Sequence, residues 1–524
     1  MTWIDALSRA ELDAKGRVVV RTNGRQILVM ATDRGIFAFP NRCPHEGYPL
    51  SEGSLNGDCQ LTCNWHNWKF DLTTGANLTG GDALRRFPVR VEAGRIWLDL
   101  VEPPPAERRA RILAALPEAL GDRDQQRIVR ETARLAEAGL DPVDAVRTAF
   151  DWSHDRLRYG MTHAAAGAAD WLALHDEAET GSAERLVCLG EILGHLADDV
   201  RQDAVYPFAE GTETWSEPGF LAAIEREDEA KAIRLIRGGL ASGLGSEALQ
   251  PVLARAAMAH YQDFGHSLIY ALKCGDLVRR LGPDSSQAVL LPYVRSLVYA
   301  TREDLLPEFR DYARQRSDWG RARPEPTPLH AAALRGGSPR TAMAVVAAWA
   351  PSHPPEAIFA TLVEAASWAL LHADAAQFER SDVKLADSAN WLDLTHMLTF
   401  AEAGARAAAL DPVLWPAVLL QLACFLGRNA GFVDADVDAT SWLVEDPAAL
   451  RPIVRRRLFD HGVALFIFSV HLLKTALAAE ALAKIVPGAA PILAASVNRF
   501  LHAPIKPRHV LRTARQMQDF VAEE

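Results

Sequence analysis

The chain has 524 residues, which is too long for one hydrophobic core, so two or three domains are expected. Its net charge is −11 and no long basic run occurs, which argues against a nucleic acid as the partner. The N-terminus lacks a charged-then-apolar signal, and the apolar run 463–470 leads straight into His471 and Lys474, so neither export nor a membrane span is predicted. Six cysteines do not form a disulfide framework in a chain of this length, which suits a reducing cytoplasm.

Short β-rich runs fill the first hundred residues. They lie at 17–21, 26–32 and 35–39, and residues 87–100 are typical of a closing hairpin with Ala93 and Gly94 at its turn. Three prolines at 103–105 then form a stiff connection. We therefore predict a small all-β domain over residues 1–102 and a proline-rich linker over residues 103–108.

Two pairs of metal-binding side chains stand in this domain. Cys43-x-His45 and Cys63-x-x-His66 are separated by seventeen residues. Two thiolates can hold one iron of a [2Fe–2S] cluster while two neutral imidazoles hold the other. A structural zinc site is the alternative, because Cys₂His₂ also suits Zn²⁺. Zinc fingers, however, rarely combine these two spacings, and they do not need the flanks P-L-S-E-G and W-K-F-D-L-T-T-G that this chain carries.

These pairs and flanks closely resemble the Rieske iron–sulfur family over roughly residues 1–100. The resemblance implies a [2Fe–2S] cluster bound by Cys43, His45, Cys63 and His66. One departure is Asn67, where the family usually has glycine, but asparagine tolerates a positive φ and the turn is expected to survive. Tyr48 and Trp65 occupy the positions of the extra disulfide of the respiratory members. Cys59 is therefore expected to be a free, half-buried thiol, and the cluster to be of the ferredoxin or oxygenase type.

After the prolines the sequence becomes rich in alanine, leucine and arginine with helical periodicity, which predicts one large all-α domain over residues 109–524. No fixed-period repeat is evident. The expected fold is therefore multidomain α+β, with the small all-β domain first. The predicted helices, of which some of the longer ones are expected to be two, are 106–120, 123–138, 142–152, 160–175, 184–200, 218–239, 246–281, 285–300, 302–316, 327–335, 338–350, 354–374, 388–409, 412–427, 447–484, 487–501 and 506–522.

An iron–sulfur cluster fused to a large domain suggests that this domain receives the electrons, yet two common iron sites do not fit. A D-x-x-H-x-x-x-x-H stretch would supply a two-histidine, one-carboxylate site. Its first half occurs three times, at Asp151 and His154, Asp263 and His266, and Asp393 and His396, but the second histidine is absent from each. A di-iron bundle needs paired E-x-x-H, and the sequence contains none.

Four other segments carry a histidine in an apolar helical context: Y-G-M-T-H to His163, F-G-H to His266, W-L-D-L-T-H to His396, and S-V-H-L-L-K from Ser469 to Lys474. Together they resemble the questin-oxidase family over roughly residues 125–510. Its members are all-helical non-haem iron oxygenases that open or oxidise polyketide quinone rings. The resemblance implies a mononuclear Fe(II) bound by His163, His266, His396 and His471, with Lys474 carboxylated by CO₂ as a further ligand.

A departure lies at Tyr270, where a second histidine is expected, so His260 and His330 are alternatives for the second segment. Residues i and i+3 share a helix face, so His471 and Lys474 can reach one point. A buried lysine has a lowered pKa, and its neutral amine can capture CO₂. The competing interpretations are a core histidine bonded to a carbonyl and a lysine that extends to the helix edge.

We therefore predict a cytoplasmic iron oxygenase that takes O₂ and an apolar aromatic, polycyclic or quinone-like substrate. No strand is followed by a G-x-G-x-x-G dinucleotide loop, so a separate NAD(P)H-dependent reductase or a ferredoxin would supply electrons. The proline linker is compatible with a homo-oligomer in which a cluster serves a neighbouring subunit. Two alternatives stay open: a dinuclear iron site built on the D-x-x-H pairs, and a Rieske electron carrier whose helical part only docks a partner.

Overall fold

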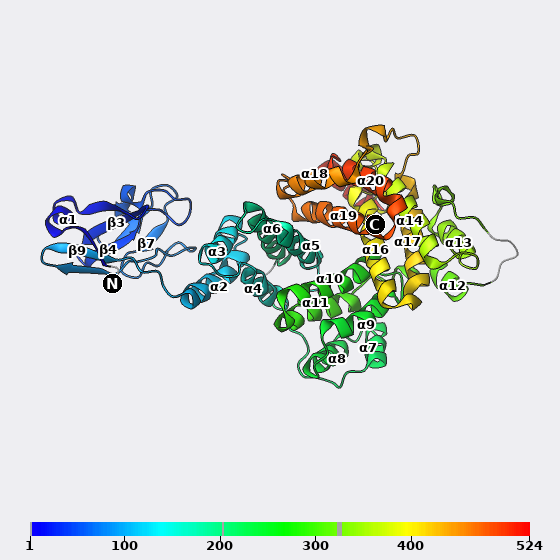
Figure 1. Ribbon diagram of the computed structural model, residues 1–524, viewed down its shortest axis with the longest axis horizontal. Helices are drawn as coiled ribbons and strands as arrows, with labels where there is room; N and C mark the ends of the chain where they lie inside the picture. The colour runs from blue at the N-terminus through cyan, green and yellow to red at the C-terminus, as the bar shows by residue number, and fades with distance from the viewer. Residues whose placement is uncertain (1–2, 202–203, 322–326, 524) are drawn as a thin grey trace. The chain divides into compact units, whose positions relative to one another are not determined.

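The computed structural model describes residues 3–201, 204–321 and 327–523 (Figure 1). By contacts the chain divides into two compact units, Met1–Asp122 with Arg134–Leu140, and Arg123–Ala133 with Asp141–Glu524. The predicted fold class is confirmed, because a small β-sheet domain precedes a large all-helical region. The first unit also takes in helix α2 (Pro105–Gly121), so the domain limits 1–102 and 109–524 stay a proposal.

The first unit contains three small antiparallel sheets, ordered β1-β9-β8, β2-β3-β4 and β5-β6-β7. Ala93 and Gly94 both have positive φ at the turn between β8 and β9, as the hairpin prediction requires. Sequence patterning missed β1, α1 and the short strands β5 to β7. The elements are β1 (Trp3–Ser8), α1 (Arg9–Lys15), β2 (Arg17–Thr22), β3 (Arg25–Thr32), β4 (Gly35–Pro40), β5 (Ser54–Leu55), β6 (Gln60–Thr62), β7 (Lys69–Asp71), β8 (Val89–Glu92) and β9 (Arg95–Asp99).

Strand β3 lies at the centre of the first unit and is buried on both faces. Leu28 and Met30 pack into one apolar core, which also contains Cys43 and Cys63. Ile27 and Val29 pack into a second core on the other face. An apolar run without alternation is what a strand covered on both faces requires. The two cysteines of the predicted cluster are thus part of the first core.

The regular elements described in the second unit are helices, apart from isolated bridges. Its helices, together with α3, which spans the division between the units, are α3 (Gln125–Glu137), α4 (Asp144–Ser153), α5 (His163–Glu177), α6 (Ala183–Asp199), α7 (Glu217–Glu225), α8 (Glu229–Ala241), α9 (Ser246–Met258), α10 (His266–Leu281), α11 (Ser286–Val298), α12 (Tyr312–Ser317), α13 (Pro339–Trp349), α14 (Pro355–Leu371), α15 (Ala375–Glu379), α16 (Trp391–Leu410), α17 (Trp415–Asn429), α18 (Pro447–Phe459), α19 (Phe466–Ile485), α20 (Ala490–Leu501) and α21 (Val510–Ala522).

Three of the long predicted helices are each two helices in the structure. The segment 218–239 breaks at Glu227, which has φ 56°, and 447–484 breaks near Gly462, which has φ 65°. The segment 246–281 breaks before His266, where three successive residues have positive φ. A left-handed residue cannot continue a right-handed helix, so each break has a local backbone cause.

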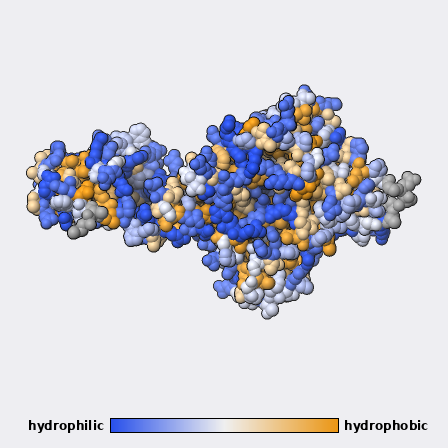
Figure 2. All heavy atoms as spheres, in the orientation of Figure 1, coloured by the Kyte–Doolittle hydropathy of each residue, from blue (hydrophilic) through white to orange (hydrophobic). Residues whose placement is uncertain are grey.

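Two helical stretches are long and apolar enough to cross a membrane by length and composition alone, Pro412–Phe432 and Phe466–Ile485. In the structure 72% and 67% of their apolar windows are buried among other helices, as core helices of a folded unit are. On the face drawn in Figure 2, hydrophobic residues form scattered patches among hydrophilic ones. These stretches are therefore explained by burial in the helical core.

Four helices form a ring in which each packs on two others: α10 on α5 and α16, and α19 on α5 and α16. His163 and His266 are the first residues of α5 and α10, and His396 and His471 are the sixth residues of α16 and α19. Each histidine therefore lies within the first two turns of a different helix. The ring is what brings four segments distant in sequence to one place.

Gly167 sets the separation of α5 and α19 in this ring. A Cβ atom at position 167 would overlap Cγ2 of Val470, which stands next to His471. We expect Gly167→Ala to lower the free energy of unfolding by about 1–3 kcal/mol, because overpacking forces the helices apart. Calorimetry would measure this loss, with Gly431→Ala as control, since the described residues leave open space around position 431. Equal melting temperatures for the two variants would contradict it.

Candidate metal centres

Two loops of the same shape carry the cysteine–histidine pairs of the first unit. The backbone N–H of Cys43 donates to the carbonyl of Tyr48, and that of Cys63 donates to the carbonyl of Trp68, both at 2.8 Å. In each loop the fourth residue after the cysteine donates back to the cysteine carbonyl, from Gly47 at 2.8 Å and from Asn67 at 2.9 Å. Both of these residues have positive φ, 79° and 61°. The turn therefore survives with Asn67 in place of glycine, as expected.

The loops place the two cysteines inside the unit and the two histidines at its surface. Cys43 and Cys63 are buried, and burial is the main cause that raises the pKa of the Cys43 thiol to about 11. The rings of His45 and His66 have centroids 4.7 Å apart, and the indole of Trp68 stacks on His45 at 4.5 Å. Two adjacent thiols with two adjacent imidazoles fit a [2Fe–2S] cluster with two ligands of each kind.

Cys59 is a free thiol, as predicted, but it is fully buried rather than half-buried. It packs in the core beneath the loops, where its thiol lies 3.3 Å from Oγ1 of Thr32.

The profile of the Rieske [2Fe–2S] domain family matches residues 2–88 of the chain. The N-terminal part of this chain is a Rieske domain. The ferredoxin component of a naphthalene 1,2-dioxygenase system from Pseudomonas aeruginosa is 29% identical over 100 residues, which are 19% of this chain and 95% of the relative. The ferredoxin component of an alkene monooxygenase system from Xanthobacter autotrophicus is 31% identical over 108 residues, 20% of this chain and 84% of the relative.

Among solved structures, the ferredoxin of carbazole 1,9a-dioxygenase from Nocardioides aromaticivorans is 22% identical, with a TM-score of 0.18. The match covers 19% of this chain and 97% of the ferredoxin. These comparisons concern the Rieske domain. The resemblance of the helical region to the questin-oxidase family stays a prediction.

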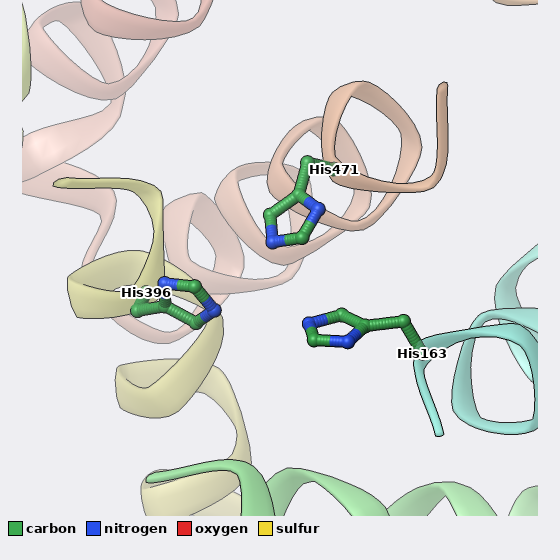
Figure 3. A group of neighbouring side chains, drawn as sticks. All are labelled: His163, His396 and His471. Carbon is green, nitrogen blue, oxygen red and sulfur yellow. The ribbon is translucent and has the colours of Figure 1, made fainter. Parts of the chain in front are cut away.

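In the helical unit the four predicted histidines lie together. Figure 3 shows three of them, His163, His396 and His471, directed toward one point from α5, α16 and α19, and their ligand atoms all lie within 4.8 Å of one another. His266 completes the group, because its Nε2 lies 3.0 Å from Nε2 of His163 and 2.9 Å from Nε2 of His396. Two nitrogens bound at about 2.1 Å and at right angles to one metal ion would be about 3.0 Å apart.

In three of the rings, the hydrogen bond made by the outer nitrogen determines which nitrogen faces the point that the histidines share. Nδ1 of His266 lies 2.7 Å from the carbonyl of Asp263, and Nδ1 of His471 lies 2.6 Å from that of Ile467. His396 hydrogen-bonds the carbonyl of Leu392. A carbonyl only accepts, so these three rings carry their proton on the outer nitrogen and turn an Nε2 lone pair inward.

Inward lone pairs at these distances are suited to a shared cation. Two unprotonated Nε2 atoms 2.9 Å apart, in His266 and His396, cannot form a hydrogen bond. Nε2 of His471 is buried and has no hydrogen-bond partner among the described residues. Burial lowers the pKa of all four imidazoles, that of His266 to about 3, and the charge of Lys474 lowers each pKa further. Four neutral imidazoles that share one point are a donor set suited to a transition-metal ion.

Lys474 is the fifth member of the predicted set and is 7% exposed. Burial lowers the pKa of its amine to about 7, against the opposing influence of the Asp170 carboxylate. Thr162 and Thr475, which adjoin His163 and Lys474 in the sequence, have buried hydroxyls without a hydrogen-bond partner in the described part of the chain.

The alternative ligands lie elsewhere. His260 hydrogen-bonds Asp304 and Glu225, each at 2.8 Å, and His330 caps the short 3₁₀ turn Ala331–Leu334. Asp393 of the dinuclear alternative accepts the N–H of Asn390 at 2.7 Å as part of the cap of α16. That carboxylate already has a structural role, so the geometry does not favour a second metal at this D-x-x-H pair.

Tyr270 is the departure noted in the sequence, at the position where the family resemblance implies a second histidine. Its hydroxyl lies 3.3 Å from Nδ1 of His163 and gives that ring the outer partner that carbonyls give the other three. The sequence drew attention to position 270 but could not predict that its hydroxyl contacts His163.

We expect Tyr270→Phe to weaken metal binding at the four histidines by about 10- to 100-fold, because an outer hydrogen bond orients a ligating imidazole. Calorimetric titration with Co²⁺ would measure the affinity. Tyr293→Phe is the control, since the buried hydroxyl of Tyr293 donates to the Ser267 carbonyl at 3.1 Å and to none of the four histidines. Unchanged affinity in Tyr270→Phe would show that this hydroxyl does not support His163.

Proposed function

We propose that this chain is a Rieske-fused non-haem iron oxygenase. In this proposal the cluster of the Rieske domain accepts electrons from a separate NAD(P)H-dependent reductase or a ferredoxin. His163, His266, His396 and His471 would hold one Fe(II), and the helical unit would oxidise an apolar aromatic, polycyclic or quinone-like substrate with O₂. The proposal includes a cytoplasmic location and leaves room for a homo-oligomer.

The gathering of the four histidines around one point carries the proposal. Support of a second kind comes from the Rieske domain, since it resembles proteins named as parts of dioxygenase and monooxygenase systems. A protein from Methylococcus capsulatus named 4beta-methylsterol monooxygenase also matches, at 34% identity over 91 residues, which are 24% of its length. An electron-carrying domain fused to a four-histidine centre is a combination suited to an oxygenase.

The residues of the chain have separable tasks in this proposal. An iron bound at the histidines would supply O₂ activation. The imidazoles stay neutral because burial holds each pKa low, so they can act as ligands at physiological pH. The helices α5 and α16 that carry two of them are rich in buried alanine and leucine.

Lys474 would supply the negative charge that four histidines lack. Its neutral amine attacks CO₂, an N–C bond forms, and one proton leaves, so that the side chain becomes a carbamate. The lowered pKa supports this step, since it raises the share of neutral amine at physiological pH.

Counting iron and acid-labile sulfide in anaerobically prepared protein tests the proposal. We expect roughly three irons and two sulfides per chain, and roughly two irons with unchanged sulfide in Lys474→Ala, because the histidine site loses its anionic ligand. Roughly two irons and two sulfides in both proteins would leave only the electron carrier. Roughly four irons would favour the dinuclear site. An unchanged third iron in Lys474→Ala would remove the lysine from the ligand set.

A further inference from the structure

The segment that leads into His266 has an unusual backbone. Asp263, Phe264 and Gly265 have φ of 49°, 50° and 83°, and α10 begins at the next residue. A left-handed conformation is costly for Asp263 and Phe264, and surrounding structure must hold it in place. Gly265 is required, because a Cβ there would lie 2.6 Å from the Phe400 ring.

The same segment supplies the outer hydrogen bond of His266. The carbonyl of Asp263 lies 2.7 Å from Nδ1 of the ring, so the position of this one peptide sets the direction of Nε2. Any relaxation of the segment toward an ordinary backbone would move that carbonyl and turn the imidazole away from His163 and His396.

Glu303 holds the segment from outside the ring of helices. Its Oε1 accepts the N–H of Phe264 at 2.8 Å, and its own N–H donates to the carbonyl of Tyr261 at 2.8 Å. The backbone N–H of Asp263 likewise donates to the carbonyl of Thr301, at 3.1 Å. The Glu303 side chain is fully buried, and its hydrogen bond is the described one that holds the backbone N–H of Phe264, whose ring lies under the Arg428 guanidinium.

Burial of the Glu303 carboxyl group at this position disfavours the folded state. Its Oε2 has no hydrogen-bond partner among the described residues, and burial raises the pKa of Glu303 to about 8. An apolar side chain of similar size would avoid that cost, since burying an unpaired polar atom disfavours the folded state. A role in holding Phe264 accounts for its presence.

We propose that Glu303 is a positioning residue for His266, acting through the Phe264 N–H and the Asp263 carbonyl. This inference rests on the proposed metal centre. Glu303 touches neither the four histidines in any described contact nor Lys474, so its influence passes through the backbone of residues 263–265.

The test compares two variants of full-length protein that keeps its cluster. Glu303→Met removes the acceptor at nearly the same volume, and Glu303→Gln keeps a carbonyl oxygen that can accept the same N–H. We expect calorimetric titration with Co²⁺ to show about 10- to 100-fold weaker binding in Glu303→Met and near-normal binding in Glu303→Gln. Hydrogen exchange of the peptide that contains Phe264 should accelerate in Glu303→Met alone.

Gln421→Met is the matched control for loss of a buried polar side chain. Gln421 is 1% exposed and donates to the carbonyl of His260 at 3.0 Å, away from the four histidines. Equal Co²⁺ affinity in Glu303→Met and wild type would overturn the inference, and so would an equal loss in Gln421→Met. If the wild-type protein did not bind Co²⁺ at the histidines, the proposed function would be wrong. The hydrogen-exchange rates of the peptide that contains Phe264 would still decide whether Glu303 anchors residues 263–265.

Discussion

His471→Leu is expected to lose about one iron per chain while its acid-labile sulfide stays at the wild-type value. Leucine fills most of the imidazole volume but offers no lone pair, and removing one of four shared ligands should lower metal affinity at least 100-fold. The metal-free variant should be as stable as metal-free wild type or more so, because the unpartnered Nε2 is no longer buried. Metal analysis and calorimetry with and without Fe(II) would measure both effects.

The stability difference separates a ligand from a core histidine. Metal present at 100 times its dissociation constant stabilises the wild type by about 2.7 kcal/mol, and His471→Leu should gain nothing from the same addition. His372→Leu is the control: Nδ1 of His372 bonds the carbonyl four residues earlier, at 3.0 Å, as Nδ1 of His471 does, but His372 lies outside the group of four. Equal destabilisation of His471→Leu with and without metal would identify His471 as a structural residue.

The sequence revealed the chemistry of both centres more readily than their geometry. Local signals sufficed for the Rieske loops, because ligands, turn residues and flanks all lie within one stretch from Cys43 to Gly75. The tolerance of asparagine for positive φ was enough to predict that the turn survives at Asn67, which has positive φ in the structure. The prediction that Cys59 is half-buried was wrong. Its full burial depends on packing against residues of strands β3 and β4, which no local sequence pattern encodes.

The helical centre shows where local signals stop. His163 and His471 are more than 300 residues apart, and only the packing of α5 on α19 brings them together. A family resemblance was enough to single out the four histidines. It could not predict the groups that hydrogen-bond their outer ring nitrogens, because three of these groups are backbone carbonyls, which any residue type can supply. Glu303 was hidden for a related reason: in the polar run R-E-D it looks like a solvated acid. Its burial arises from contacts with a segment forty residues earlier.

Cys63→Ser is expected to abolish the cluster and, with it, turnover driven by an external reductase. A serine hydroxyl is a poor substitute for a thiolate toward iron, so both cluster irons and both sulfides should be lost. The iron at the four histidines should stay, because it depends on side chains of the helical unit alone. Roughly one iron and no sulfide per chain is the expected composition, with reductase-driven substrate oxidation reduced at least 100-fold.

Cys59→Ser supplies the internal control for that result. Cys59 is buried in the same core as Cys63, but its thiol bonds only the hydroxyl of Thr32 in the described contacts, so its replacement should lower stability and leave the sulfide intact. If Cys59→Ser lost the sulfide and Cys63→Ser kept it, the ligand assignment would be wrong. If Cys63→Ser lost all its iron, metal binding at the histidines would depend on the cluster, and the two centres would load as one unit. Chemical reduction of Cys63→Ser then decides between electron supply and site assembly: a single turnover in reduced protein means that the helical centre is complete and lacks only its electrons.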